Sequence, residues 1–596
     1  MRLFDRYLQS VKEIPEDRLD AFCAEIRSFL IKNVAKTGGH LASNLGVVEL
    51  TVALHRVFDT ASDRIVFDVG HQCYVHKLLT GRKDGFPNMR SFGGMSGFPK
   101  PGESVHDAFA AGHASTSVSA ALGFARARTL LKEGYHCVAV LGDGALTGGL
   151  AYEGLNDAGQ SGEPLIVVLN DNGMSIKKNV GGVARHLTKL RLQPRYFNAK
   201  RFTHRLLDPL PAGRAVARFL HRGKEFIKNA VIPGSLFAQM GFEYLGPTDG
   251  HDIKAVTNLF RQAATLKKPV LIHLVTQKGR GYAFSENNPS KYHGVKSFRV
   301  AYGVGDEAAC DAFSRRFGDI LTNLAETDRK IVAVTAAMQT GTGLDRFAER
   351  FPHRFFDVGI AESHAVTMAA AMAKQGLRPV VAVYSTFLQR AYDQIVHDVA
   401  LQNLPVVFVV SHAGLCGEDG ETHHGVFDPF FLASVPNLTL RTPCTAYELD
   451  RILMDALNGT GPVAIRIPKT PLPLPDLFLP ARRCREGSDA TILTYGGMTG
   501  VALETAERLT GTISVGVTSL TSLKPLPEVI PTEGEVFILE DNPGFLAGKV
   551  KGVAINTGDR FIPQGSEADL LRFCRLDAAS VSSLIASAFG RDRRYG

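Results

Sequence analysis

Two apolar runs bracket the stretch that most constrains the fold. Residues 136–141 are HCVAVL and residues 164–169 are PLIVVL, and the runs end in the polar turns Gly-Asp-Gly (142–144) and Asn-Asp-Asn (170–172). Unbroken apolar runs of this length are typical of parallel strands that are buried on both faces. The segment between them, about residues 146–160, is long enough for one crossover helix. The stretch therefore predicts a β-α-β unit.

The two polar turns belong at one edge of the predicted sheet. Both strands of a β-α-β unit run the same way, so Asp143 and Asn172 are expected to emerge together at the carboxyl edge, where open α/β sheets bind ligands. Carboxylate and amide oxygens suit Mg2+, which usually completes its shell with phosphate oxygens. The flanking glycines allow a phosphate to approach the backbone closely. The alternative is a pair of ordinary strand-to-helix turns, in which these residue types are common anyway.

This pattern resembles the diphosphate-binding motif of thiamine diphosphate (ThDP) enzymes. The resemblance implies that Asp143, Asn172 and the main-chain carbonyl of Met174 ligate a Mg2+ ion that bridges the cofactor's diphosphate.

Length and composition indicate a large globular protein. The chain has 596 residues, which is more than one hydrophobic core supports, and its 45% hydrophobic and 21% charged content is that of a soluble protein. No apolar run is long enough to span a membrane, and the charged start lacks the apolar core of a secretory signal, so we expect a cytoplasmic protein without a membrane partner. The eight cysteines are scattered and form no CxxC pair, which argues against a zinc site and a disulfide framework.

The net charge of +8 has no nucleic-acid motif beside it, so anionic small molecules are the expected partners rather than nucleic acid. Much of the positive charge lies in residues 175–235. This segment is either a solvated basic surface or a mobile lid whose field attracts anions.

Strand-like runs recur along the chain and predict an α/β protein of three domains, each with a mainly parallel sheet flanked by helices. The first domain is expected at residues 1–300, the second at 301–475 and a shortened third at 476–596. The runs are at residues 64–70, 136–141, 164–169 and 269–276 in the first, 330–337, 379–385, 405–411 and 462–469 in the second, and 490–496, 513–520 and 535–541 in the third.

Three histidines occupy junctions in the first domain where a strand or a glycine turn gives way to a helix. They are His40 in GGHLASN, His71 in FDVGHQ and His113 in AGHASTS. A single histidine of this kind is more often a hydrogen-bonded structural residue. Three of them at the edge where Asp143 also emerges favour a functional site.

Polar residues also follow the predicted strands of the second domain. Glu362 opens a helix of small residues, where a carboxylate can either favour the helix dipole or serve a site. Residues 384–394 (YSTFLQRAYDQ) and 417–425 (GEDGETHHG) place hydroxyl, aromatic, guanidinium, carboxyl and imidazole groups at strand ends. Core packing requires none of these groups there, so a site is indicated.

Together these motifs resemble the 1-deoxy-D-xylulose 5-phosphate synthase family of transketolase-like ThDP enzymes. The matching stretches are GGHLASNLGVVEL, FDVGHQCYVHKLLTGR, FGGMSGFPKPGES, GHASTS, GDG and NDN, KGRGY, AESHAVTMAAAMA, YSTFLQRAYDQ, GEDGETHHG and FIPQG. They cover the first two domains closely and the third loosely. The resemblance implies a diphosphate-binding first domain, a pyrimidine-binding second domain, a transketolase-like third domain and a homodimer.

The resemblance also implies roles for individual residues. Phe387 would stack on the aminopyrimidine, and Glu362 would hydrogen-bond its ring nitrogen and so favour the imino tautomer that removes the thiazolium proton. The remaining contacts with ThDP would come from His71, Gly112, His113, Ala114, Gly144, Ala145, Asn172 and Tyr282.

The implied reaction is decarboxylation of pyruvate and transfer of the two-carbon unit to a phosphorylated aldehyde, D-glyceraldehyde 3-phosphate, giving 1-deoxy-D-xylulose 5-phosphate. Fixed hydrogen bonds would stabilise the charge that develops on the reacting oxygens. The groups expected there are His40, His71, His423 and Asp419, with His293 and Lys278 as weaker candidates.

The sequence departs from the family pattern at the acceptor phosphate. Tyr384 and Arg390 are present, but His412 and Lys469 stand where the family has arginines. Each charge-assisted hydrogen bond is worth roughly 1.5 to 3 kcal/mol, and neither residue can duplicate the bidentate geometry of a guanidinium. Three hypotheses follow: the synthase itself, a paralogue with another aldehyde acceptor, and a non-catalytic relative that keeps the fold.

Overall fold

The chain divides into two compact units in the computed structural model, which describes residues 3–175, 179–191, 236–305 and 310–590. Unit 1 comprises Met1–Asp84 and Phe98–Gly303, and unit 2 comprises Gly85–Gly97 and Val304–Gly596. The short segment at residues 85–97 therefore packs with unit 2, although it lies within the span expected for the first domain. Most of the basic segment 175–235 lies outside the described residues.

Unit 1 is built on a five-stranded parallel sheet in the order β1-β2-β3-β5-β4. The strands are β1 (Arg64–Phe67), β2 (Cys137–Gly142), β3 (Ile166–Asp171), β4 (Glu243–Asp249) and β5 (Val270–Val275). The predicted β-α-β unit is confirmed, because α7 (Gly149–Ser161) joins β2 to the parallel strand β3. The edge strand β4 was not predicted, since its Gly-Pro pair at residues 246–247 interrupts the apolar run.

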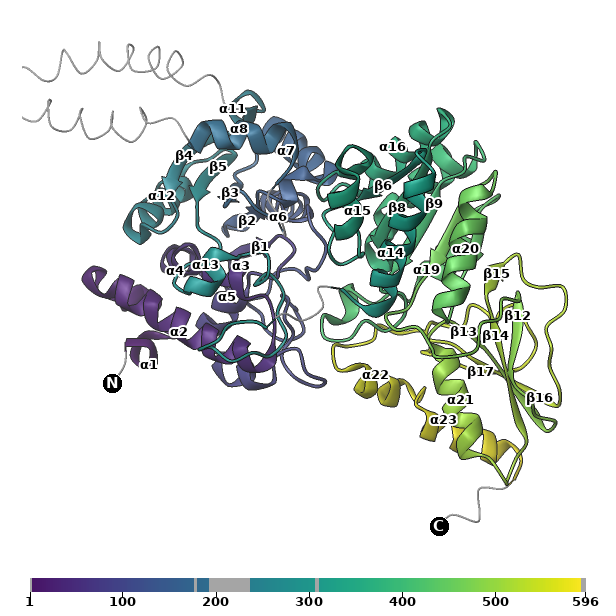
Figure 1. The fold of residues 1–596 in the computed structure, drawn as a ribbon. Coiled ribbons are helices and arrows are strands. Elements are labelled where there is room, and N and C mark those ends of the chain that lie inside the picture. Colours follow the sequence, from purple (N-terminus) through teal and green to yellow (C-terminus); the bar gives the residue numbers. More distant parts are fainter. Residues whose placement is uncertain (1–2, 176–178, 192–235, 306–309, 591–596) are drawn as a thin grey trace, which may run out of the picture. The chain divides into compact units, whose positions relative to one another are not determined.

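Helices surround this sheet (Figure 1). Helix α6 (Ser117–Leu131) packs against β1, β2 and α7, and it buries Val118, Ala121, Leu122 and Ala125 along one face. The unit also contains the helices α1 (Leu3–Tyr7), α2 (Leu19–Thr37), α3 (Leu41–Leu45), α4 (Val48–Val57), α5 (Tyr74–Leu79), α8 (Gly181–Arg191), α11 (Leu236–Gln239), α12 (Ile253–Thr265) and α13 (Ala283–Asn287).

Unit 2 contains two sheets. The first has seven strands in the order β15-β10-β11-β9-β8-β6-β7, and the second has five in the order β12-β14-β13-β16-β17. The strands are β6 (Ile331–Thr335), β7 (Phe355–Asp357), β8 (Arg378–Tyr384), β9 (Val407–Ser411), β10 (Thr439–Arg441), β11 (Val463–Arg466), β12 (Ala481–Arg485), β13 (Ala490–Tyr495), β14 (Val515–Leu520), β15 (Ser522–Lys524), β16 (Glu535–Leu539) and β17 (Val553–Ile555).

The helices of unit 2 cover these sheets and supply the site residues described below. They are α14 (Ala312–Thr327), α15 (Asp345–Arg350), α16 (Glu362–Lys374), α17 (Ser385–Leu388), α18 (Tyr392–Gln394), the π-helix η7 (Ile395–Ala400), α19 (Asp428–Ala433), α20 (Ala446–Asn458), α21 (Met498–Arg508), α22 (Glu567–Cys574) and α23 (Ala578–Ala588).

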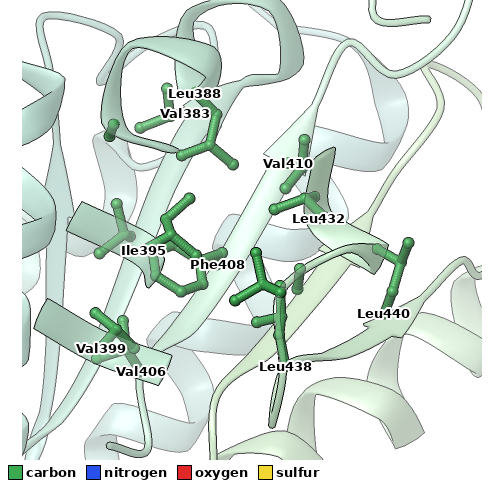
Figure 2. Packing of buried hydrophobic residues seen from close by; sticks show 14 of the residues in the cluster. Val383, Leu388, Ile395, Val399, Val406, Phe408, Val410, Leu432, Leu438 and Leu440 are labelled. Atoms are coloured by element: carbon green, nitrogen blue, oxygen red, sulfur yellow. The ribbon is translucent and has the colours of Figure 1, made fainter. Parts of the chain in front are cut away.

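A buried hydrophobic cluster packs against one face of the seven-stranded sheet. Figure 2 shows Val383 at β8, Ile395 at η7, Phe408 at β9 and Leu432 at α19 converging on this cluster. Each of the four side chains is at most 1% exposed. The strand ends therefore project from a closely packed core, which holds the residues that follow them in place.

The predicted fold class is confirmed: in the part of the chain that the structure describes, three sheets, mainly parallel and flanked by helices, make up an α/β protein. Of the pairs between these named strands, only β12 with β14 and β10 with β15 are antiparallel. Strand β15 comes from the region expected to form the third domain, yet it pairs with β10 and extends the seven-stranded sheet. Among the described residues, no helix is both long and apolar enough to cross a membrane.

Candidate active site

The two polar turns lie at the carboxyl edge of the unit 1 sheet, on neighbouring strands. Asp143 follows β2 and is 3% exposed; its Oδ1 accepts from the Gly144 N–H at 3.1 Å and its Oδ2 from the Gly173 N–H at 2.7 Å. Asn172 follows β3, and its Oδ1 accepts from the Met174 N–H at 3.0 Å. The second turn is thus hydrogen-bonded to the carboxylate of the first.

Electrostatics at this edge favour a bound cation. Burial raises the pKa of Asp143 well above its ordinary value, and the neighbouring Asp171 carboxylate raises it further. Two buried carboxyl groups in contact repel each other when ionised, and a divalent cation would relieve that repulsion. The described residues contain no group of three or more His, Cys, Asp or Glu side chains arranged for a metal. A site with one carboxylate, one amide and one carbonyl fits Mg2+, which needs few protein ligands beside phosphate oxygens.

The turn at 142–144 has no room for a side chain at Gly144. A Cβ there would lie 2.8 Å from the Cβ of Ser175, so only glycine fits. The next residue, Ala145, is buried, and its carbonyl oxygen accepts from the Ser115 hydroxyl at 2.7 Å. The Gly144–Ala145 backbone is therefore joined to the segment that precedes α6.

That segment is also tied to the end of β1. Asp68 is fully buried and accepts from the backbone N–H groups of Ser115 at 2.7 Å and Ser117 at 3.0 Å. These bonds hold the residues that precede Ser115 at the same sheet edge as the two polar turns. Those preceding residues are the predicted cofactor contacts Gly112, His113 and Ala114.

Three imidazoles form a triangle in unit 1. The ring centroids of His40 and His71 are 5.3 Å apart, those of His71 and His293 5.2 Å, and those of His40 and His293 5.5 Å. His71 Nε2 lies 3.1 Å from the Ser43 hydroxyl. The triangle contains two of the three junction histidines and adds His293, which the sequence indicated only weakly.

Lys278 lies beside this triangle. Its side chain is buried, its ammonium group donates to the Ser175 carbonyl, and Nζ is 3.1 Å from His293 Nδ1. Burial lowers the pKa of Lys278 to about 8. Burial and the nearby ammonium group also lower the pKa of His293 well below its ordinary value, so this imidazole is neutral at physiological pH.

Tyr282 lies in an aromatic cluster at the start of α13. Its hydroxyl donates to the Val300 carbonyl at 2.8 Å, and its ring centroid is 5.7 Å from that of Tyr292. The Tyr292 carbonyl accepts from the Ala42 N–H at 2.9 Å, which places the cluster next to α3. The described contacts of Tyr282 are thus with this cluster rather than with the two polar turns.

In unit 2, Glu362 is the first residue of α16 and is 4% exposed. Burial raises the pKa of its carboxyl group, and the positive charge of Arg390 opposes that rise. Arg390 is held near this helix because the Ser363 hydroxyl donates to its carbonyl at 2.8 Å. A carboxyl group with a raised pKa keeps its proton more readily and can donate a hydrogen bond.

Four of the predicted residues form an aromatic group at the ends of β8 and β9. The rings of Tyr384 and His412 stack with centroids 3.9 Å apart, and Tyr384 and Phe387 stack at 6.0 Å. The His423 ring meets Phe387 edge-on at 5.5 Å. Residues that follow two different strands are thus brought together in one group.

Asp419 forms an ion pair that the sequence did not predict. Arg90 Nη2 and Nε donate to Asp419 Oδ1 at 2.8 and 3.1 Å, and the Arg90 side chain is mostly buried. The two residues are far apart in sequence, so no local pattern pointed to the pair. Asp419 therefore accepts from a guanidinium within unit 2.

The two residues that replace arginines also have partners. Lys469 Nζ donates to the Cys416 carbonyl at 2.6 Å. His412 Nδ1 is 3.7 Å from Asp311 Oδ2, and burial together with the charge of Lys469 lowers the pKa of His412 to about 3. His412 is consequently neutral at physiological pH.

Three family models match the chain in succession. Residues 6–276 match the model described as 1-deoxy-D-xylulose-5-phosphate synthase, residues 312–475 the pyrimidine-binding domain of transketolase, and residues 480–580 the transketolase C-terminal domain.

Curated relatives match over nearly the full length. The chain is 46% identical to 1-deoxy-D-xylulose-5-phosphate synthase of Clostridium tetani, with 97% of this chain and 98% of the relative covered. It is 50% identical to the synthase of Desulforudis audaxviator, with 90% and 87% covered. A solved transketolase from Campylobacter jejuni is 18% identical over 96% of this chain and 100% of that chain, with a TM-score of 0.43.

Proposed function

The chain belongs to the 1-deoxy-D-xylulose-5-phosphate synthase family, and on this premise we propose how its residues serve the family's reaction. The protein is a transketolase-like transferase that decarboxylates pyruvate and joins the two-carbon unit to D-glyceraldehyde 3-phosphate, giving 1-deoxy-D-xylulose 5-phosphate and carbon dioxide. ThDP supplies, when bound, a thiazolium group that accepts the electron pair left by decarboxylation. The structural observation that carries the proposal is the buried carboxyl of Glu362, whose pKa is raised.

Glu362 would hold a proton where the aminopyrimidine ring nitrogen binds. Its raised pKa means that it keeps its proton more readily than an exposed glutamate, and proton transfer at that nitrogen is the chemistry that the family requires. Phe387 offers an aromatic face in the same unit for stacking. This pair supports the assignment of the α16 and α17 region as the pyrimidine-binding surface.

The polar turns of unit 1 would hold Mg2+ and the diphosphate. Asp143, Asn172 and the Met174 carbonyl are the proposed ligands, and the repulsion between the buried Asp143 and Asp171 carboxyl groups supports a cation there. Gly142 and Gly144 carry no side chains that would screen the backbone of this turn from an anion. The other proposed cofactor contacts are His71, Gly112, His113, Ala114, Ala145 and Tyr282.

The histidine triangle would bind the oxygens of the reacting groups. His40 and His71 present imidazoles beside the neutral His293, and the Lys278 ammonium adds a positive charge at the same place. Such fixed donors stabilise charge that develops on an oxygen without rearranging. His423 and Asp419, held by Phe387 and Arg90, are the proposed counterparts in unit 2.

Two measurements on the full-length protein test the reaction. Calorimetry with ThDP and Mg2+ should show saturable binding, and carboxyl-labelled pyruvate with glyceraldehyde 3-phosphate should release labelled carbon dioxide and form the pentulose phosphate. Absence of both binding and release would remove the enzymatic function and favour a non-catalytic relative.

A paralogue with a different aldehyde acceptor is a second candidate, and one observation favours it. His412 is neutral and Lys469 is hydrogen-bonded to a carbonyl, so fewer free charges face a phosphate than two arginines would offer. Tyr384 and Arg390 would remain as phosphate partners. Steady-state kinetics with phosphorylated and free aldehydes separates the candidates: the highest kcat/KM with glyceraldehyde 3-phosphate supports the synthase, and a higher value with a free aldehyde supports the paralogue.

We further propose a homodimer in the cytoplasm, with domains at residues 1–300, 301–475 and 476–596. Both the dimer and the domain roles come from the family resemblance. Sedimentation velocity over a range of protein concentrations tests the dimer, which predicts a species of twice the 64.5 kDa chain mass.

A further inference from the structure

A chain of hydrogen bonds crosses four strands of the unit 1 sheet beneath the polar turns. The Tyr244 hydroxyl on β4 is 2.7 Å from His273 Nδ1 on β5, and His273 Nε2 is 2.9 Å from Asp171 Oδ2 at the end of β3. The chain continues through the Gly173 N–H, which donates to Asp171 Oδ1 at 3.3 Å and to Asp143 Oδ2 at 2.7 Å. Tyr244 is thereby connected to the proposed metal ligand Asp143.

The partners fix the direction of each bond. Asp171 accepts from the Gly173 N–H and lies 3.4 Å from the Arg191 Nε atom, as expected for a carboxylate. A carboxylate cannot donate, so His273 Nε2 carries the proton, and Nδ1 is left to accept from the Tyr244 hydroxyl. This order is the same as in sites where a carboxylate and a histidine orient a third group.

These polar groups occupy positions that packing alone would fill with apolar residues. Asp171 and His273 are fully buried, and the neighbours of His273 on β5, Ile272 and Leu274, are buried hydrophobic residues. A buried polar group must find a hydrogen-bond partner to offset its loss of water, whereas an apolar pair of the same shape would need none. The interior of the sheet therefore carries a polar chain at positions where apolar side chains could also pack.

The hydrogen-bonded series reaches the second polar turn through Asp171, its central member. Asp171 directly precedes Asn172, and Gly173 directly follows it. The Asp171 side chain accepts a hydrogen bond from the Gly173 N–H. The next residue, Met174, is fixed by its own bond to Asn172. The orientation of the Asn172 amide and the Met174 carbonyl therefore depends on where Asp171 is held.

We propose that Asp171, His273 and Tyr244 are positioning residues that hold the 172–174 turn in the geometry a divalent cation needs. The inference rests on the proposed function, because it concerns the same metal site. Groups that orient metal ligands typically change metal affinity by about tenfold to a hundredfold when they are removed. None of the three residues contacts the cation in this proposal.

The positioning role is tested by the affinity of the full-length protein for Mn2+ in excess ThDP. Electron paramagnetic resonance measures the free Mn2+ in this titration. Asp171→Asn and His273→Asn should each weaken Mn2+ binding by about tenfold or more. The double variant should bind no more weakly than the weaker single variant, because both substitutions break one chain. Tyr244→Phe, which removes one oxygen and keeps the ring, should weaken binding about threefold, between wild type and His273→Asn.

His76→Asn is the matched control. His76 and Asp107 form another buried histidine–aspartate pair in unit 1, with Nε2 and Oδ1 3.2 Å apart. This variant should lose thermal stability without ligand to a similar extent as His273→Asn but keep the wild-type Mn2+ affinity. A loss of affinity equal to that of His273→Asn would show that stability alone explains the effect and would overturn the proposal.

The outcomes also separate this inference from the proposed function. Wild-type binding with unchanged affinity in Asp171→Asn, His273→Asn and Tyr244→Phe would reject the positioning role and leave the function intact. A wild-type protein that binds neither Mn2+ nor ThDP would reject both.

Discussion

At the scale of single residues, burial determines which groups carry protons. Glu362 and His412 are both enclosed within unit 2, and burial acts on their pKa values in opposite directions because it disfavours the charged form of each. The carboxyl group tends to keep its proton, and the imidazole tends to lose its proton. The consequences for activity and for stability are separately measurable.

Glu362→Gln should reduce carbon dioxide release by roughly a hundredfold to ten-thousandfold, because the amide keeps the shape and a hydrogen-bond donor but cannot exchange a proton with the ring nitrogen. ThDP affinity measured by calorimetry should change by less than about tenfold. Glu326→Gln, at an exposed position of α14, serves as the control and should behave as wild type. Near-normal turnover in Glu362→Gln would contradict the role of this carboxyl.

His412 should make unit 2 less stable in mild acid. Its pKa is about 3 when folded and near 6.5 when unfolded, so the unfolded chain takes up the proton first as the pH falls. The contribution to stability is complete above pH 6.5 and is lost progressively between pH 6.5 and 3. By pH 5 the loss amounts to about 2 kcal/mol.

Urea unfolding at pH 7 and pH 5 measures this effect. His412→Asn should reduce the pH dependence by the stated amount, whereas the other buried histidines contribute equally to both proteins. An identical pH dependence in wild type and variant would mean that His412 does not titrate as proposed.

At the scale of elements, the spacing of two helices sets the position of the backbone around the proposed diphosphate site. Helix α6 follows the Gly112–Ala114 segment and α7 follows the Gly144–Ala145 turn, and the two helices pack against each other. Gly154 of α7 lies directly against α6, because a Cβ there would be 2.9 Å from the Ser119 hydroxyl oxygen and 3.1 Å from the Ser119 backbone nitrogen. Helix separation, and hence the position of both segments, depends on this glycine.

Gly154→Ala should destabilise unit 1 by about 1 to 3 kcal/mol, because the methyl group meets helix backbone that cannot move freely. Gly123→Ala is the matched control within α6: a Cβ there has no atom within 4 Å. That substitution should instead stabilise by about 0.5 to 1 kcal/mol, since glycine is costly inside a helix. Thermal or urea unfolding of both variants measures the contrast, and equal effects of the same sign would refute the packing argument.

At the scale of the whole molecule, a buried ion cluster joins the two sheets of unit 2. Arg466 at the end of β11 is 1% exposed; its Nε donates to Asp428 of α19 at 2.8 Å and its Nη2 to Asp541, beyond β16, at 3.2 Å. Burial raises the pKa of Asp428 to about 6, against the opposing charge of Arg466. The cluster is one of the contacts that join the regions around both sheets, beside the hydrophobic cluster to which both sheets contribute.

Arg466→Met should lower the stability of unit 2 by about 3 to 5 kcal/mol, because it leaves two buried carboxyl groups without their cation. Hydrogen exchange followed by mass spectrometry should show faster exchange in β11 and β16 and unchanged exchange in β3 of unit 1. Arg316→Met, which removes an exposed ion pair with Asp450, should cost less than about 1 kcal/mol. Equal exchange in Arg466→Met and wild type would contradict the structural importance of the cluster.

Much of the fold was predictable because its signals are local. An apolar run of six residues with a polar turn behind it indicates a buried parallel strand wherever it occurs, and residues 137–142 and 166–171 confirmed this interpretation. Short or interrupted strands such as β4 and β15 carry no such signal. Which sheet such a strand joins depends on which neighbouring strand has an unpaired edge in the folded protein.

The sequence by itself determined the βαβ unit, the two polar turns and the family, because each of them is recognisable from residue types at fixed spacings along the chain. Tertiary structure decided how the site residues are supported. It brought His293 to His40 and His71, paired Arg90 with Asp419, and aligned Tyr244 and His273 with the Asp171 carboxylate. These contacts join residues from distant parts of the chain. Sequence spacing cannot reveal them, because the packing of strands and loops alone sets which side chains meet.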